Sequence, residues 1–186
     1  MEALLIIGAI ALAIIVLVVG IYNRLVALRQ MTRQAWSDIE VQLKQRQDLV
    51  PQLVNTVKGY AAHERETFEE VIAARQAAVN ASSVEGQAAT EGLLGQALGK
   101  LFALAEAYPE LKANTNFLQL QDKLSDIENK IAAARRFYNN AVQEYNTSTE
   151  QFPAVLLAGP FNFEPREFFE APEGREMLQT PVEVTF

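Results

Sequence analysis

An uninterrupted apolar run at the N-terminus constrains this chain more than any other feature. Ala3 to Ile21 reads ALLIIGAIALAIIVLVVGI, nineteen residues without a charge. As an α-helix, this run would span roughly 29 Å, which matches the hydrocarbon core of a bilayer. We therefore expect residues 1–22 to form a transmembrane anchor.

A cleavable signal peptide is the main alternative for this run. Only Met1 and Glu2 precede it, without a basic side chain, and no Ala-x-Ala-like cleavage site follows it. We therefore expect an uncleaved, single-pass anchor in the cell (inner) membrane. Arg24, Arg29 and Arg33 follow the run closely, so the positive-inside rule predicts that the rest of the chain is cytoplasmic.

Composition limits what the rest of the chain could be. About 165 residues follow the run, enough for one soluble domain. The chain has no cysteine, which excludes disulfides, thiolate metal sites and thiol catalysis. Its net charge of −7 argues against nucleic-acid binding, which needs clustered basic residues. Residues 24–60 carry six basic and three acidic side chains, so this part suits an anionic lipid surface.

The anchor is expected to continue into water as a helical stalk. Between Ile10 and Leu49, Gly20 is the one helix-weakening residue. Positions three and four residues apart then form a mainly apolar stripe: Ile21, Leu25, Leu28, Thr32, Ala35, Ile39, Leu43, Arg46, Val50, Leu53 and Val57. Pro51 lies within this pattern, so we expect a kink or a helix restart there, with Asp48 as the new cap.

Further helices are predicted over residues 62–79, 91–107 and 117–152. Residues 80–90 are rich in Ser, Ala, Gly and Gln, which indicates a loop or a frayed connection. The last helix is the clearest, with Asn116 as a cap and Pro153 as its stop. Its seam of three- and four-residue steps predicts antiparallel packing against the stalk: Phe117, Leu120, Leu124, Ile127, Ile131, Ala134, Tyr138, Ala141, Tyr145, Ser148 and Phe152.

Beyond Phe152 the chain is rich in proline, glycine and phenylalanine. The phenylalanines are Phe161, Phe163, Phe168, Phe169 and Phe186. We expect an extended tail packed on the bundle, because so many aromatic side chains are unfavourable in water.

A search for catalytic or metal-binding patterns yields one acidic segment. His63 is the single histidine, and Glu64, Glu66, Glu69 and Glu70 follow it. The segment lacks the second histidine of a zincin helix and the Glu-x-x-His repeat of a di-iron bundle. We interpret it as a solvated acidic face, and an adventitious divalent-cation site is the alternative. No catalytic, cofactor-binding or metal-ligating residue is predicted.

Two stretches are more specific than any catalytic pattern. The first stretch comprises Arg46-Gln47-Asp48-Leu49-Val50-Pro51-Gln52-Leu53-Val54, Val57-Lys58-Gly59-Tyr60-Ala61 and His63-Glu64. The second stretch comprises Phe137-Tyr138-Asn139, Tyr145-Asn146, Phe152-Pro153 and Phe168-Phe169-Glu170. With these residues the chain resembles the LemA family over nearly its whole length. The resemblance implies a membrane-anchored antiparallel bundle of long helices without an established enzymatic activity. It also implies a membrane-organising role, because the family includes a protein of magnetosome membrane formation.

The residues of these stretches also have a purely structural interpretation. Pro51 and Gly59 would shape a helix bend, and the aromatic residues Phe137, Tyr138, Tyr145 and Phe152 would pack the core. Binding of a partner is the alternative role for the same residues.

The sequence thus predicts an all-α protein: a transmembrane helix (1–22), an antiparallel bundle (23–152) and an extended tail (153–186). We expect a non-catalytic scaffold that self-associates as a homo-oligomer at the lipid bilayer. The argument for self-association is apolar surface outside the main stripe, at Leu25, Val26, Met31, Trp36, Val41, Leu49 and Val54. The alternatives to a scaffold are an adaptor for an unidentified membrane protein and a carboxylate-metal enzyme.

Overall fold

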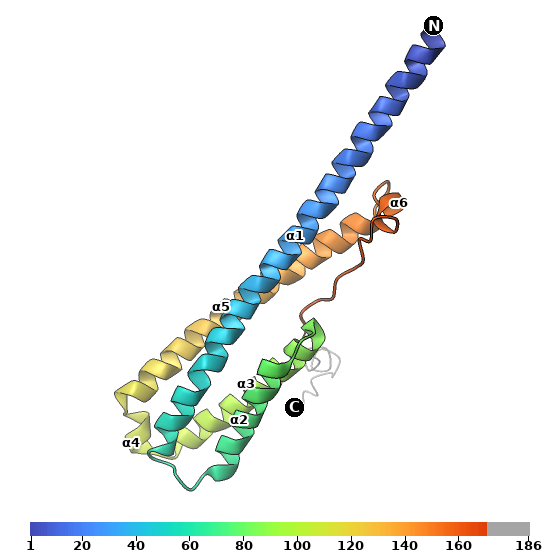
Figure 1. Ribbon diagram of the computed structural model, residues 1–186. Helices are drawn as coiled ribbons and strands as arrows, with labels where there is room; N and C mark the ends of the chain where they lie inside the picture. Colours follow the sequence, from blue (N-terminus) through green and yellow to red (C-terminus); the bar gives the residue numbers. More distant parts are fainter. Residues whose placement is uncertain (171–186) are drawn as a thin grey trace, which may run out of the picture. The chain divides into compact units, whose positions relative to one another are not determined.

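The computed structural model describes residues 1–170, which contain helices, turns and extended segments and no strand. Along this part of the chain the helices are α1 (Glu2–Lys58), α2 (Arg65–Asn80), α3 (Val84–Glu106), α4 (Pro109–Lys112), α5 (Thr115–Glu150) and α6 (Val155–Ala158) (Figure 1). The prediction of an all-α fold with long helices is confirmed.

Helix α1 contains the N-terminal apolar run. Among the described residues it is the one helix that is long and apolar enough to cross a membrane. The side chains of the run point outward, with exposed fractions of 75% at Leu4, 65% at Ile7 and 63% at Leu12. A helix that is apolar on all sides and packs against no other part of the described chain is unfavourable in water. A lipid bilayer provides a suitable apolar environment for such a helix.

The chain forms two compact units. Unit 1 comprises Met1–Ser37 and Arg136–Glu167, and unit 2 comprises Asp38–Arg135 with residues 168–170. Helices α1 and α5 therefore each contribute one segment to each unit. Helices α2, α3 and α4 belong to unit 2, and α6 belongs to unit 1.

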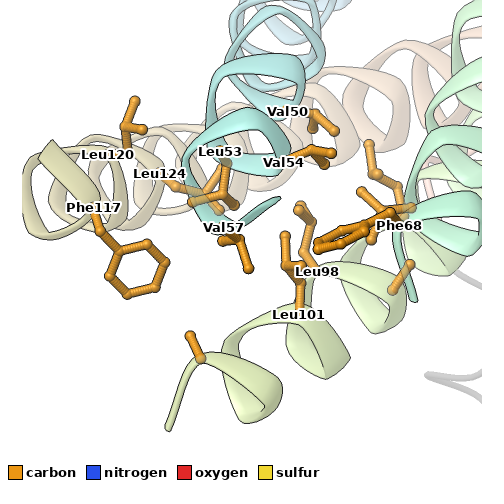
Figure 2. Close-up of a cluster of buried hydrophobic side chains, with 14 of the residues drawn as sticks. Val50, Leu53, Val54, Val57, Phe68, Leu98, Leu101, Phe117, Leu120 and Leu124 are labelled. Atoms are coloured by element: carbon orange, nitrogen blue, oxygen red, sulfur yellow. The ribbon is translucent and has the colours of Figure 1, made fainter. Parts of the chain in front are cut away.

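Unit 2 has a large apolar core. Helix α1 contributes Val50, Leu53, Val54 and Val57, and the side chains of the other helices meet them in one cluster (Figure 2). The other labelled members are Phe68 of α2, Leu98 and Leu101 of α3, and Phe117, Leu120 and Leu124 of α5. The cluster forms because each helix carries its apolar residues on one face.

Unit 1 has a smaller core around one aromatic residue of α5. Leu25 and Leu28 of α1 cluster with Tyr145, and Ala158 and Phe163 complete the group. Further along α1, the ring of Trp36 lies 5.4 Å from that of Tyr138. Residues later in α1 therefore meet residues earlier in α5, so the two segments of unit 1 run antiparallel, as predicted.

The predicted stripe of α1 is confirmed from Leu25 to Val57, since all its members in that range are buried, Thr32 and Arg46 included. The seam of α5 is also buried for the most part. Ala134 is half-buried, and Phe152 is the one exposed member, with 80% of its surface exposed. The reason is that α5 ends at Glu150, so Phe152 no longer follows the helical period.

Three local predictions, a helix restart at Pro51, a loop over residues 80–90 and a cap at Asn116, were wrong. Helix α1 passes through Pro51 without a restart, and Asp48 accepts a hydrogen bond from Lys44 instead of capping a helix. The expected loop over residues 80–90 is mostly helix, because Ser83 accepts a hydrogen bond from the N–H of Gly86 and starts α3 there. The residue that caps α5 is Asn114 and not Asn116, since its Oδ1 accepts from the N–H of Phe117.

After α6, residues 159–162 form turns and residues 163–170 have no regular secondary structure, and the side chains of Phe163 and Phe169 are buried. The predictions for Phe186 and the rest of residues 171–186 lie outside the described residues. The boundaries predicted at residues 22 and 152 stay predictions.

Candidate functional site

A buried polar network occupies the interior of unit 2, and it is built on the first of the two specific sequence stretches. The residue Arg46 is 4% exposed and lies on the apolar stripe of α1. One of its terminal nitrogens (Nη2) donates to both the main-chain oxygen and Oε2 of Glu91 in α3, each at 2.6 Å. The other (Nη1) donates to Oε1 of Glu128 in α5 at 2.6 Å. One guanidinium therefore joins three helices.

The neighbouring residue Gln47 extends this network to a fourth helix. Its Nε2 donates to Oε1 of Glu91 at 2.6 Å. Its main-chain oxygen accepts a hydrogen bond from Nε of Arg75 in α2 at 2.7 Å. That oxygen needs a donor because Pro51, four residues later, has no N–H to complete the helical hydrogen bond. Arg75 thus supplies the missing donor, which explains how α1 continues through a proline.

The electrostatics of the network centre on Glu91. Burial raises the pKa of Glu91 above its ordinary value, and the attraction to Arg46 and the hydrogen bonds from Gln47 and Arg46 oppose this shift. Both of its carboxylate oxygens accept hydrogen bonds from side chains of α1. Glu128, by contrast, has a side chain that is 42% exposed, so water solvates part of its charge.

The arrangement favours a structural function for the network. The side-chain oxygens of Glu91 already accept hydrogen bonds from Arg46 and Gln47, so the Glu91 carboxylate is engaged within the protein. A cleft of about 360 Å³ adjoins it, lined by Arg46, by Gly95, Leu98, Gly99 and Phe102 of α3, and by Gln121, Leu124, Ser125 and Glu128 of α5.

The acidic segment after His63 is spread over the surface of unit 2. Glu64 accepts a hydrogen bond from the hydroxyl of Tyr108 at 3.3 Å, and Glu70 forms an ion pair with Lys100. Glu66 and Glu69 are exposed on α2. Within residues 1–170 no three acidic or histidine side chains come close enough together to hold a metal ion.

Unit 1 carries the second specific stretch, which holds the tail in place. The side-chain amide of Asn146 donates to the main-chain oxygen of Arg166 at 2.9 Å and accepts from its N–H at 2.8 Å. The hydroxyl of Tyr138 donates to the main-chain oxygen of Glu167 at 2.9 Å. Burial raises the pKa of Tyr138, so this hydroxyl stays protonated and remains a donor.

An aromatic cluster in unit 1 lies directly after the apolar run. The ring of Tyr22 meets the edges of Phe161 at 5.1 Å and Phe163 at 5.7 Å, measured between ring centroids. The guanidinium of Arg29 lies 4.8 Å from the centroid of Phe163. The tail therefore returns to the point where α1 leaves the apolar run.

The sequence interpretation of the two stretches was correct for Tyr138 and Tyr145, which are core residues. It was wrong for Phe137 and Phe152, which are 47% and 80% exposed. Periodicity missed Glu91 as the partner of Arg46. An arginine on an apolar stripe was the available signal, because a buried guanidinium needs a carboxylate partner.

The fold and these sites define a helical-bundle protein in which α1 is a candidate membrane-spanning helix. The sequence model of the LemA family matches residues 35–186, and the chain belongs to this family. It is 28% identical to magnetosome protein MamQ 2 of Paramagnetospirillum magneticum, in an alignment that covers 86% of this chain and 69% of the relative. It is 27% identical to magnetosome protein MamQ of Magnetospirillum gryphiswaldense, with the same coverage. It is also 28% identical to protein LemA of Metamycoplasma hominis, over 83% of this chain and 71% of the relative.

Proposed function

We propose that this protein is a membrane-anchored, non-catalytic scaffold that self-associates at the bilayer. The observation that carries this proposal is the structure of α1 in unit 1. The same helix presents an exposed apolar run and, directly after it, the buried residues Leu25 and Leu28. The helix that enters the membrane therefore also forms the core of the folded unit. The similarity to proteins named magnetosome proteins supports a structural role at a membrane.

Self-association is the finer part of this proposal. Two of the apolar residues first offered for it, Leu25 and Val54, are buried within the chain itself. Met31 and Val41 remain 37% and 52% exposed, and Leu93 of α3 is 51% exposed. Copies confined to one bilayer meet at a high effective concentration, so weak contacts through such residues suffice for assembly.

The test is the native mass of the full-length protein in mild detergent over a wide concentration range. We expect an oligomer whose apparent affinity falls, without being lost, when residues 1–22 are deleted. The triple variant Met31→Gln, Val41→Gln, Leu93→Gln should weaken the oligomer further. A strictly monomeric mass at every concentration would contradict self-association and would favour the adaptor, whose partner a pull-down from solubilised membranes should capture.

Sidedness is a separate part of the proposal. We place the folded units in the cytoplasm because Arg24, Arg29 and Arg33 follow the anchor, and basic residues resist translocation. A reporter that is active only in the cytoplasm, fused after Phe186, should be active. Digestion of the tail by a protease added outside intact spheroplasts would reverse the assignment.

A further inference from the structure

The segment between α5 and the extended tail forms an unusual apolar surface, which we call the apolar corner (residues 151–163). It reads QFPAVLLAGPFNF and contains no ionisable side chain, whereas Glu150 and Glu164 flank it directly. Four of its large side chains point into solvent: Phe152 is 80% exposed, Leu156 64%, Phe161 48% and Val155 46%. Exposed apolar residues gathered in one short segment indicate a contact surface.

The position of the apolar corner is fixed by contacts within unit 1. Ala158 and Phe163 pack with Leu25 and Leu28 of α1, and Ile21 packs against the same cluster. Ile21 is the last residue of the N-terminal apolar run. The ring of Phe161 lies 5.1 Å from that of Tyr22, the next residue of α1. The apolar corner therefore lies beside the exit point of the anchor, as Figure 1 shows for α6 and α1.

The end of the anchor, beside which the apolar corner lies, corresponds to a particular layer of the membrane. The anchor spans the hydrocarbon core, so residues at its end lie in the headgroup region, which is about 5 to 8 Å thick on each side. Tyrosine is enriched at that level because its ring is apolar and its hydroxyl is polar. Tyr22 is 36% exposed there, and the exposed side chain of Arg24 follows within one turn and suits the lipid phosphates.

We propose that the apolar corner is a second membrane contact, in which Phe152, Val155, Leu156 and Phe161 insert into the boundary between lipid headgroups and acyl chains. The inference rests on the proposed anchor, since the anchor sets the height of the corner. Lipid is the occupant that fits best because the surface is uncharged, aromatic and aliphatic, and continuous with the lipid-facing run of α1. Two contacts, the span and the corner, then hold unit 1 against the bilayer.

The absence of cysteine from the chain allows a direct test. A spin label is attached to one introduced cysteine in the full-length protein, which is reconstituted in vesicles of phosphatidylcholine and phosphatidylglycerol. Collision rates are then measured with oxygen, which concentrates in lipid, and with a nickel chelate, which stays in water. The test positions are Phe152→Cys and Leu156→Cys. Both replace exposed side chains, so the fold should be retained, and an unchanged melting curve checks this.

The matched control is Phe137→Cys, which replaces an exposed phenylalanine of the same unit, roughly 20 Å earlier along α5. We expect the logarithm of the oxygen-to-nickel ratio to be positive for labels at Phe152 and Leu156 and negative at Phe137. A negative value at both test positions would overturn the proposal. A label shielded from both reagents, or a value that changes with the protein-to-lipid ratio, would also overturn it, because a protein surface would then cover the corner.

A label at Leu12→Cys separates this proposal from the anchor itself. Leu12 lies within the apolar run and should give a strongly positive value. If Leu12 is in lipid while both corner positions are in water, the anchor stands and the second contact is refuted. If Leu12 is also in water, the proposed anchor fails, and the second contact fails with it.

Discussion

The two units of this protein are stabilised in different ways. Unit 2 has a large apolar core, to which five helices contribute, and a charged network around the buried Arg46. Unit 1 has two long helix segments, and an extended segment with Asn146 and Tyr138 as its polar attachment points completes its core. Unit 2 therefore depends on a few buried charges within regular packing. Unit 1 depends on the packing of the segment after α5 against the part of α1 that follows the apolar run.

The strongest test of this difference is Arg46→Leu in unit 2. The substitution leaves Glu91 buried without its cationic partner, and an unpaired buried charge costs about 3 to 5 kcal/mol. We expect that loss in the free energy of unfolding by denaturant. The double variant Arg46→Leu, Glu91→Leu should recover much of it, because two apolar side chains replace the pair and Glu128 is partly solvated. A loss below about 1 kcal/mol in the single variant would show that the network is not buried in solution.

In unit 1 the matching test is Asn146→Ala, which removes both hydrogen bonds to Arg166. We expect a loss of about 1 to 3 kcal/mol and faster hydrogen exchange at the N–H of Arg166. Asn140→Ala is the control, since Asn140 is exposed on the same helix. Equal exchange in the two variants would contradict the role given to Asn146.

The pH dependence of unit 2 tests the electrostatics of Glu91. Because burial raises its pKa above the ordinary value of 4.5, the native state holds this proton more tightly than the unfolded state does. The Glu91 contribution to the free energy of unfolding therefore falls as the pH rises from the ordinary pKa to the raised pKa, by about 1.4 kcal/mol for each pH unit between them. Glu91→Gln should lack this decrease. If the free energy of unfolding of the wild type instead rises with pH relative to that of Glu91→Gln, the attraction of Glu91 to Arg46 outweighs the effect of its burial.

A double-mutant cycle tests the role of Arg75 beside Pro51. Pro51→Ala restores an N–H that can donate to the main-chain oxygen of Gln47, so Arg75 becomes less important. Arg75→Ala should destabilise the wild type by about 1 kcal/mol more than it destabilises the Pro51→Ala variant. Additive effects in denaturant unfolding would contradict the compensation.

The smallest expected effect concerns the glycines of α3. A Cβ atom at Gly95 or Gly99 would meet nothing within 4 Å. Replacement by alanine should therefore stabilise unit 2 by about 0.5 to 1 kcal/mol each, through helix propensity. If Gly95→Ala and Gly99→Ala instead reduce the oligomer mass in detergent, this face of α3 contacts a second copy.

The sequence predicted the buried faces of the long helices well, because helical periodicity depends on neighbouring residues. It identified Thr32 and Arg46 as members of the stripe even though both are polar. It did not predict that Glu91 joins Arg46, since periodicity shows which face is buried and not which distant residue lies opposite. The prediction of a loop at residues 80–90 was wrong because it relied on the composition of the segment and not on the single N-cap residue, Ser83. Pro51 was expected to kink or restart α1, but the helix continues without a restart, and Arg75, 28 residues away from Gln47, provides the missing donor.

Because α1 is uninterrupted, it also fixes the angle about the helix axis between the apolar run and the buried residues of unit 1. Each residue of an α-helix turns the next by roughly 100°, so Ile21 at the end of the lipid-facing run and Leu25 in the core have a fixed azimuth relative to each other. One alanine inserted between Tyr22 and Leu25 would rotate the following stripe by that angle with little loss of helix. The proposed anchor would keep its length, but Ile21 and Tyr22 would leave the helix face that Leu25 presents to the core of unit 1. The junction between the apolar run and unit 1 therefore has a fixed rotational register, because Ile21 belongs to the run and also packs against the core of unit 1.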